Sequence, residues 1–334
     1  MILLPKHKDL YLDPPTPRLR GLYKLTVRDA KTGKVTRETP WFENLITNSG
    51  LDAIWSGPAV GSGVNYIFNG CCVGTGNTVP AYTDTTLTTY LASTNFGTSG
   101  SSPMGSWVYV AAAGSVPPYW TSTGSWTFGV GVATGTLAEV GIGWGSPPSS
   151  YTLFSHALIV DGSGNPTTIT VLSNEQLTVS YTLQLYWNTV TQTGTLAFGG
   201  VTYNLSWLPS NLPTISGGPS RGINPASSGL PYPYYLNAYN GSIGTPLTLP
   251  SGTKTYINFS SSGTQSFATY IAGNYYNDCT MTVPIGYLNL PGGITVLEFE
   301  ASYHQFQISF SPAIPKTSSY SFTFINRFAW ARYP

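Results

Sequence analysis

GTLAEVGIGW (135–144) and YTLFSHALIVDGSGNPTTITVLSNEQLTVSYTLQLYW (151–187) form the stretch that decides the fold. Short apolar runs alternate here with turn residues, and residues 161–166 supply the turn chemistry between two of the runs. From Leu177 to Trp187 every second side chain is apolar or aromatic, and the residues between them are mostly polar. This period of two is typical of a strand with one buried face. We therefore predict an antiparallel β-meander over residues 139–187.

The composition favours an all-β protein. Only 8% of the 334 residues are charged, aromatic residues make up 14%, and there are 37 Gly and 26 Pro. Many short strands joined by Gly- and Pro-rich turns produce such a composition. We predict antiparallel, jelly-roll-like β-sandwich domains: an extended N-terminal arm over 1–20, a sandwich over 21–190, and a second β-rich domain over 191–334. In the alternative, 192–292 are an insertion and 293–334 complete the first sandwich.

The charged residues are few and unevenly placed. Nine of the 14 Lys and Arg residues lie within residues 1–38, and none lies within 39–220. This distribution disfavours nucleic acid as a partner, because phosphates are neutralised by such cations. Low surface charge is also typical of a surface that is buried in an assembly. We predict that the Pro-rich arm docks on a neighbouring subunit. No apolar run is long enough to predict insertion into a membrane.

Residues 47–55 (TNSGLDAIW) are the best helix candidate, with Asn48 or Ser49 as the N-cap. Cys71, Cys72 and Cys279 have no zinc-site spacing, so we predict buried thiols and no metal. GTGNTVPAYTDTTL (74–87) lacks the Lys of a phosphate-binding loop, and we predict no cofactor.

Two constellations resemble catalytic sites only superficially. Ser155, His156 and Asp161 contain the residue types of a triad, but adjacent strand residues point to opposite faces and no nucleophile loop surrounds them. Glu298 and Glu300 lie on one strand face and suggest a glycan hydrolase, although a solvent-facing strand edge explains them equally well. We predict that the chain is not an enzyme.

Two other acids, Glu139 and Glu175, are predicted to be buried hydrogen-bond acceptors near strand ends. Because residues 39–220 contain no Lys or Arg, a buried Glu139 must find backbone N–H, Tyr or Ser donors there.

The tyrosines are the remaining candidates for contacts with a partner. We predict that a set of them contacts either a host glycan or a protein interface: Tyr232, Tyr234, Tyr235, Tyr275 and Tyr276.

Three segments resemble structural proteins from the tails of tailed bacteriophages. They are WFENLITNSGLDAI (41–54), CCVGTGNTVPAYTDTTL (71–87), and the Glu-hydrophobic-Gly, Phe-Ser-His and Glu-Gln-Leu-x-Val-x-Tyr series within 137–187. Where those proteins often carry Arg after Phe-Ser, this chain has His156. The resemblance covers 41–187, with a weaker echo in FQISFSPAIPKTSSYSF (306–322), and does not cover 190–292.

The resemblance implies a virion component near the tail: a fibre, a fibre adaptor or a tail-tip protein that is made in the host bacterial cytoplasm. The expected partners are copies of itself, neighbouring tail proteins and a host surface glycan to which the virus attaches. Two alternatives stay open. One is a capsid decoration or head fibre protein, and the other is a glycan-degrading tailspike.

Overall fold

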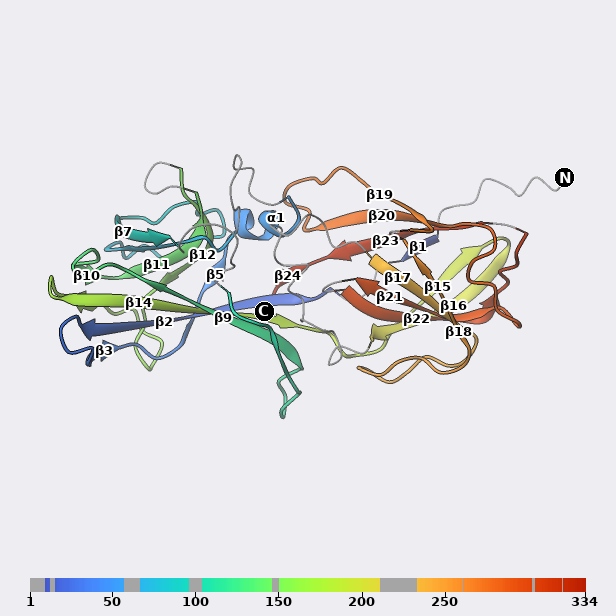
Figure 1. The fold of residues 1–334 in the computed structure, drawn as a ribbon, viewed down its shortest axis with the longest axis horizontal. Coiled ribbons are helices and arrows are strands. Elements are labelled where there is room, and N and C mark those ends of the chain that lie inside the picture. Colours follow the sequence, from blue (N-terminus) through green and yellow to red (C-terminus); the bar gives the residue numbers. More distant parts are fainter. Residues whose placement is uncertain are drawn as a thin grey trace.

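The computed structural model describes residues 10–12, 16–56, 67–95, 104–145, 150–210, 233–259, 261–301, 304–319 and 321–334. It is mostly β, with 54% strand and sandwich-like antiparallel sheets, so the predicted fold class is confirmed. Figure 1 shows an elongated molecule with two lobes along its long axis. We call them the N-terminal lobe, which holds β2 to β14 and β24, and the C-terminal lobe, which holds β15 to β23 and β1.

The N-terminal lobe packs a seven-stranded sheet against a five-stranded sheet. The larger sheet contains β2 (Arg18–Asp29), β3 (Val35–Glu38), β4 (Phe42–Glu43), β8 (Val108–Val110), β9 (Tyr119–Thr127), β14 (Glu175–Tyr186) and β24 (Ala331–Arg332). The smaller sheet contains β5 (Leu45–Ile46), β6 (Gly70–Gly74), β7 (Tyr90–Asn95), β11 (Glu139–Trp144) and β12 (Thr152–Leu158). β10 (Gly135–Leu137) and β13 (Ile169–Val171) form a separate pair.

The strand predicted from the alternation between Leu177 and Trp187 is present as β14, and its alternate side chains from Leu177 to Leu185 are buried. The predicted meander is wrong beyond its first hairpin. β11 pairs with β12, but β13 pairs with β10, and β14 lies in the other sheet between β2 and β9. The chain therefore crosses the core between β12 and β14. Across this core Tyr181 lies 6.2 Å from Phe68, and Phe68 lies 4.8 Å from Phe154, both measured between ring centroids.

The C-terminal lobe packs a six-stranded sheet against a four-stranded one. The larger sheet has the order β15 (Gln192–Phe198), β16 (Val201–Pro209), β22 (His304–Ile314), β21 (Ile294–Ala301), β17 (Pro233–Tyr239) and β18 (Lys254–Asn258). The smaller has the order β1 (Leu10–Leu12), β23 (Phe322–Ala329), β20 (Tyr276–Val283) and β19 (Thr264–Phe267). Phe299 of β21 meets Phe324 of β23 edge-on, with ring centroids 5.5 Å apart, so the two sheets share one core.

The two ends of the chain run side by side across the junction between the lobes. β1 pairs in parallel with β23, and the start of β2 pairs in parallel with β24. Between them Ala331 N–H donates to the Pro17 carbonyl at 3.1 Å. β2 begins at Arg18, inside the predicted arm, and β1 pairs within its own chain. Docking of the arm on a neighbouring subunit stays a prediction, as does the domain division near residue 190.

Helix α1 (Asn48–Ser56) confirms the predicted helix, with one change at its cap. The Thr47 hydroxyl, rather than Asn48 or Ser49, accepts the Gly50 N–H at 2.9 Å. Thr47 also donates to the Leu153 carbonyl at 2.6 Å, which ties the helix to β12. Among the described residues, no helix has the length and apolarity that crossing a membrane requires.

Candidate functional site

The junction between the lobes is built from aromatic side chains on α1 and on the C-terminal lobe. Trp55 of α1 stacks on Trp330 with ring centroids 5.8 Å apart and planes 4° apart. Trp330 also stacks on Tyr270 at 5.9 Å and donates its indole N–H to the Leu51 carbonyl at 2.8 Å. Asp52 accepts from the Tyr270 hydroxyl at 2.6 Å. Because both Trp rings are buried and the contacts span both lobes, they hold the lobes in one orientation.

The three predicted contact tyrosines whose side chains the structure describes do not form one surface. Tyr232 and the side chain of Tyr234 lie outside the described part of the chain. Tyr276 starts β20 with the Arg327 guanidinium 3.5 Å from its ring centroid. Tyr275 packs against the hydrophobic core with a positive φ of 55°. Of the three described, only Tyr235, in β17, lies on the outer face of the six-stranded sheet, with 37% of its surface exposed.

The sheet register brings Tyr235 together with the two acids that suggested a hydrolase. Tyr235 is opposite Glu300 and Asn237 is opposite Glu298, and Asn237 is also opposite Tyr256 of β18. Tyr256 is 58% exposed, and its ring meets that of Tyr235 edge-on at 6.0 Å. We call these five residues the sheet-face cluster. Sequence reasoning missed Asn237 and Tyr256, because only the register of three strands places them here.

The idea that Glu298 lies at a solvent-facing strand edge is wrong. β21 is an interior strand between β22 and β17, and Glu298 is only 1% exposed. Its carboxylate accepts from Ser210 Oγ at 2.5 Å, Tyr239 Oη at 2.8 Å and Asn237 Nδ2 at 3.0 Å. Burial raises the pKa of Tyr239, and the neighbouring Glu298 raises it further, so this hydroxyl stays protonated and donates.

The two carboxylates are therefore not equivalent. Asn237 Nδ2 also donates to Glu300 at 2.6 Å, so one amide group holds both acids in place. Glu300 is partly exposed, and its side chain lies 3.9 Å from the Lys254 ammonium. Acid–base hydrolysis of a glycan requires that both carboxylates reach the substrate. This arrangement instead offers two exposed rings beside fixed polar groups, which suits binding.

A second polar cluster lies inside the N-terminal lobe. Buried His156 contacts Glu139 through Nε2 at 3.0 Å and Asp84 through Nδ1 at 2.8 Å. Glu139 also accepts the N–H groups of Gly76, Thr88 and Thr89 at 2.7–3.1 Å. The prediction that Glu139 is a buried acceptor for backbone donors is confirmed. His156 as its partner was missed.

Burial alone would lower the pKa of His156, but the hydrogen bonds to Glu139 and Asp84 outweigh it and raise the pKa. For Glu139, burial favours the neutral acid, yet His156 and the backbone amides lower its pKa overall. Each group therefore favours the charged form of the other. The cluster fastens the loop that carries Asp84 and Thr88 to the sheet, which is a structural role.

The catalytic triad that the sequence argued against is also not assembled. Ser155 Oγ lies 2.7 Å from the Tyr23 hydroxyl, and Asp161 accepts the N–H groups of Ser163 and Asn165 in its own turn.

Glu175 is a buried acceptor as predicted, and it binds Thr36 at 2.8 Å and forms an ion pair with Arg37. The three cysteines are free and buried, also as predicted. In the described ranges, no group of three or more His, Cys, Asp or Glu side chains is arranged to hold a metal ion.

Comparisons of the chain with known protein families, with curated proteins and with solved structures find no match.

Proposed function

We propose that the chain is a structural component of a tailed-phage virion, associated with the tail as a fibre, fibre adaptor or tail-tip protein, and that it assembles as an oligomer. The observation that carries this proposal is the locked junction. Two sandwiches lie end to end, and the stacked Trp55 and Trp330 join them. Such a joint transmits position and load along the molecule, which is what a connecting part of a particle needs.

The segments that resemble tail proteins support the same proposal through their contacts. Thr47 of the first segment binds the Leu153 carbonyl of the third. Gly76 of the second segment and Thr88, the residue that follows that segment, donate their N–H groups to Glu139 of the third. The residues that carry the resemblance therefore hold one lobe together, so the resemblance concerns a building block rather than a reaction centre.

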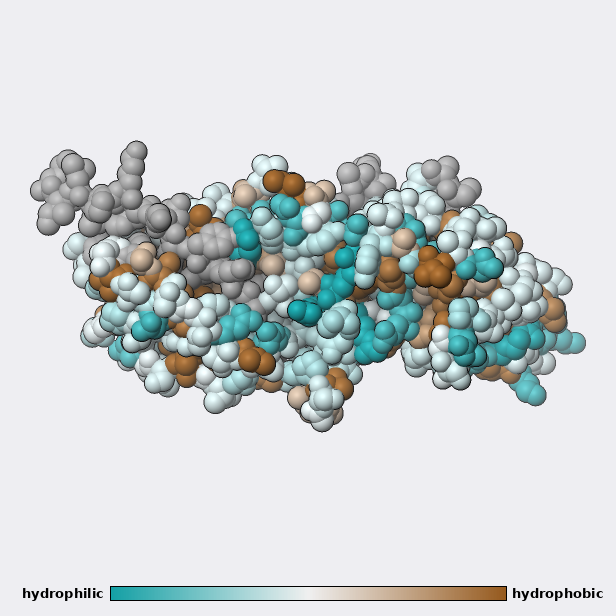
Figure 2. Space-filling model, turned by 180° about the vertical axis from the view of Figure 1, so that it is seen from behind, coloured by the Kyte–Doolittle hydropathy of each residue, from teal (hydrophilic) through white to brown (hydrophobic). Residues whose placement is uncertain are grey.

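The surface is compatible with burial in an assembly. Figure 2 shows a face on which weakly polar residues predominate and apolar residues form small, separate groups. With 8% charged residues, few side chains on such a surface would lose favourable hydration in a protein interface. Neighbouring copies and tail proteins are the partners that we propose.

Localisation of a tagged chain in purified particles tests the proposal. The tag belongs at the turn after β2, near Gly33, where an added side chain meets no atom within 4 Å. Gold labelling at the tail is the expected result. Labelling on the capsid would favour a decoration or head fibre protein, and absence of the chain from particles would refute a virion role.

Contact with a host glycan is a second part of the proposal, and the exposed Tyr235–Tyr256 pair favours it. Aromatic rings beside amide and carboxylate groups bind sugars by stacking and hydrogen bonding. We expect Tyr256→Ala to weaken competition by the purified protein for host cells, while Tyr287→Ala, at another exposed tyrosine, leaves it unchanged. Equal competition by both variants would remove the sheet-face cluster from attachment.

A further inference from the structure

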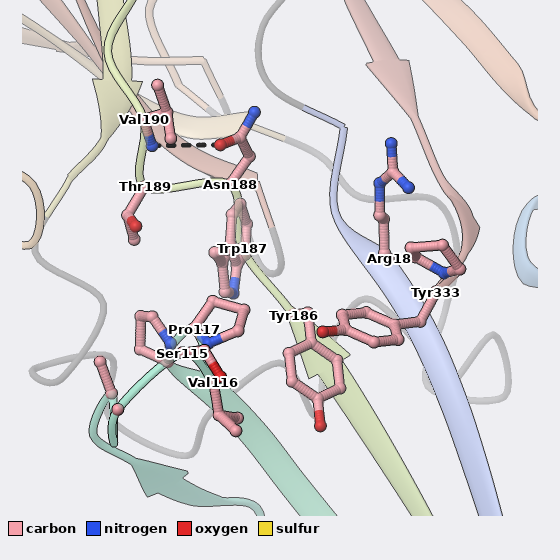
Figure 3. A pocket seen from close by; sticks show the side chains of 14 residues that line it. Arg18, Ser115, Val116, Pro117, Tyr186, Trp187, Asn188, Thr189, Val190 and Tyr333 are labelled. Atoms are coloured by element: carbon pink, nitrogen blue, oxygen red, sulfur yellow. Dashed lines mark hydrogen bonds between the residues drawn. The ribbon is translucent and has the colours of Figure 1, made fainter.

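A cleft of about 540 Å³ lies at the lobe junction, among residues that the proposed contacts do not use. It is lined by the start of β2, the loop before β9, the linker after β14 and the C-terminal residues. Figure 3 shows Arg18, Tyr333 and Asn188 around it, with Pro117 on the opposite wall. Its volume is in the range of pockets that hold small molecules.

One wall of the cleft is a preformed aromatic stack. Tyr333 packs on Tyr186 with ring centroids 4.1 Å apart, and Tyr186 packs on Tyr119 at 4.8 Å. The Tyr333 backbone is fixed because its N–H donates to the Leu19 carbonyl at 2.7 Å. Tyr333 is partly exposed at the end of this stack and borders the cleft, and the Arg20 guanidinium lies 6.0 Å from its ring centroid.

Arg18 and Asn188 supply donors to the cleft. Arg18 is exposed and has no partner within the described residues, whereas Arg20 on the same strand pairs with Glu43. Asn188 accepts the Val190 N–H at 3.1 Å through its oxygen, which leaves its NH₂ group to donate (Figure 3). No Asp or Glu side chain lines the cleft. A ligand that matches it is rich in acceptors and carries a negative charge near Arg18.

We propose that this cleft binds a saccharide unit that carries a carboxylate. The apolar face of the sugar ring stacks on Tyr333, the carboxylate pairs with Arg18, and a ring hydroxyl accepts from Asn188. A nucleotide fits less well, because its several phosphate charges would meet a single cation. The inference goes beyond the proposed structural function and does not depend on where the chain sits in a particle.

Calorimetric titration with digalacturonate tests the site, and the methyl ester of the same disaccharide is the uncharged control. We expect the acid to bind about tenfold more tightly than the ester, since an ion pair adds to stacking. Arg18→Gln should remove that preference. Arg28→Gln, at another exposed cation of β2, should keep it. Tyr333→Ala should weaken both ligands. Circular dichroism of each variant verifies that it is folded.

Four results would overturn the inference: no binding of the acid, equal binding of acid and ester, unchanged binding by Arg18→Gln, or binding of a tetra-aspartate peptide as tight as that of the sugar. The last would mean that the cleft recognises charge alone. Tyr256→Ala separates this cleft from the sheet-face cluster. Loss of binding in Tyr256→Ala together with full binding in Arg18→Gln would move the sugar to the sheet face.

Discussion

At the scale of single residues, His156 makes the N-terminal lobe sensitive to pH. Its folded pKa is raised above the usual 6.5, so its contribution to stability is fully present below that value and is lost as the pH rises through the folded pKa. The contribution of Glu139 to stability depends on pH in the opposite direction. Its folded pKa is lowered below 4.5, so its contribution is present above that value and is lost as the pH falls through the folded pKa. The cluster therefore stabilises the lobe most between pH 4.5 and 6.5, the ordinary pKa values of the two groups.

We expect His156→Gln to lower the free energy of unfolding by about 3 kcal/mol near pH 6, because it leaves the buried Glu139 without its cation. The loss should shrink as the pH rises, since the wild-type imidazole then gives up its charge as well. Thermal unfolding of both proteins between about pH 5 and 9 measures this difference. A difference that stays constant over that range would mean that His156 is neutral in the folded protein.

The pair of Glu139 and His156 shows which contacts the sequence could not predict. Glu139 was recognisable as a buried acceptor, because a lone acid in an apolar run must find donors. Its partners lie at positions 76, 88, 89 and 156, and only the folded sheet brings them to one point. No local pattern around His156 indicates that pairing.

At the scale of elements, the alternation in β14 predicted which side chains face the core but not which strands lie beside it. A period of two fixes the face of a strand. The partners β2 and β9 come from residues more than 50 positions earlier in the chain. β14 pairs with them and not with β13, which precedes it directly in the sequence. The same limit applies to the sheet-face cluster. Tyr235, Glu298 and Glu300 were each noticed, but the register of β17, β18 and β21 was needed to join them.

We expect Trp330→Ala to cost about 3–5 kcal/mol of unfolding free energy, because it empties the space between Trp55 and Tyr270. It should also let the lobes move, which small-angle X-ray scattering would detect as a broader distribution of interatomic distances. Trp41→Ala is the matched control. That ring is 45% exposed, so its removal should change stability by less than about 0.5 kcal/mol. An unchanged scattering profile for Trp330→Ala would show that other contacts lock the junction.

Deleting residues 1–12 tests the parallel pairing of the chain ends. The deletion removes β1 and leaves one edge of β23 without its partner at residues 324–326. We expect faster hydrogen exchange of amides in β23 and little change in β14. Deleting residues 1–9 retains β1 and is the control. Equal exchange rates in the two truncated proteins would mean that β1 contributes nothing to the sheet.

At the scale of the whole molecule, composition and shape lead to the same expectation. The chain has 14 basic and 13 acidic residues, and most of the cations belong to the β2–β3 region and the chain ends. Several of them are already used within the chain: Arg20 pairs with Glu43, Lys24 with Glu38, and Arg327 with Asp278. Little charge is left to keep separate copies apart in solution.

We therefore expect the purified protein to form a closed oligomer, and light scattering in solution should give a mass at least three times 35.8 kDa. Salt dissociates assemblies that are held together by exposed charges. Few exposed ionic groups are available for this interface, so added salt should not dissociate the oligomer. A trimer or larger ring would support a fibre or tail-ring position. A monodisperse monomer would contradict self-assembly and would leave neighbouring virion proteins to cover the uncharged surface, which favours an adaptor or decoration role.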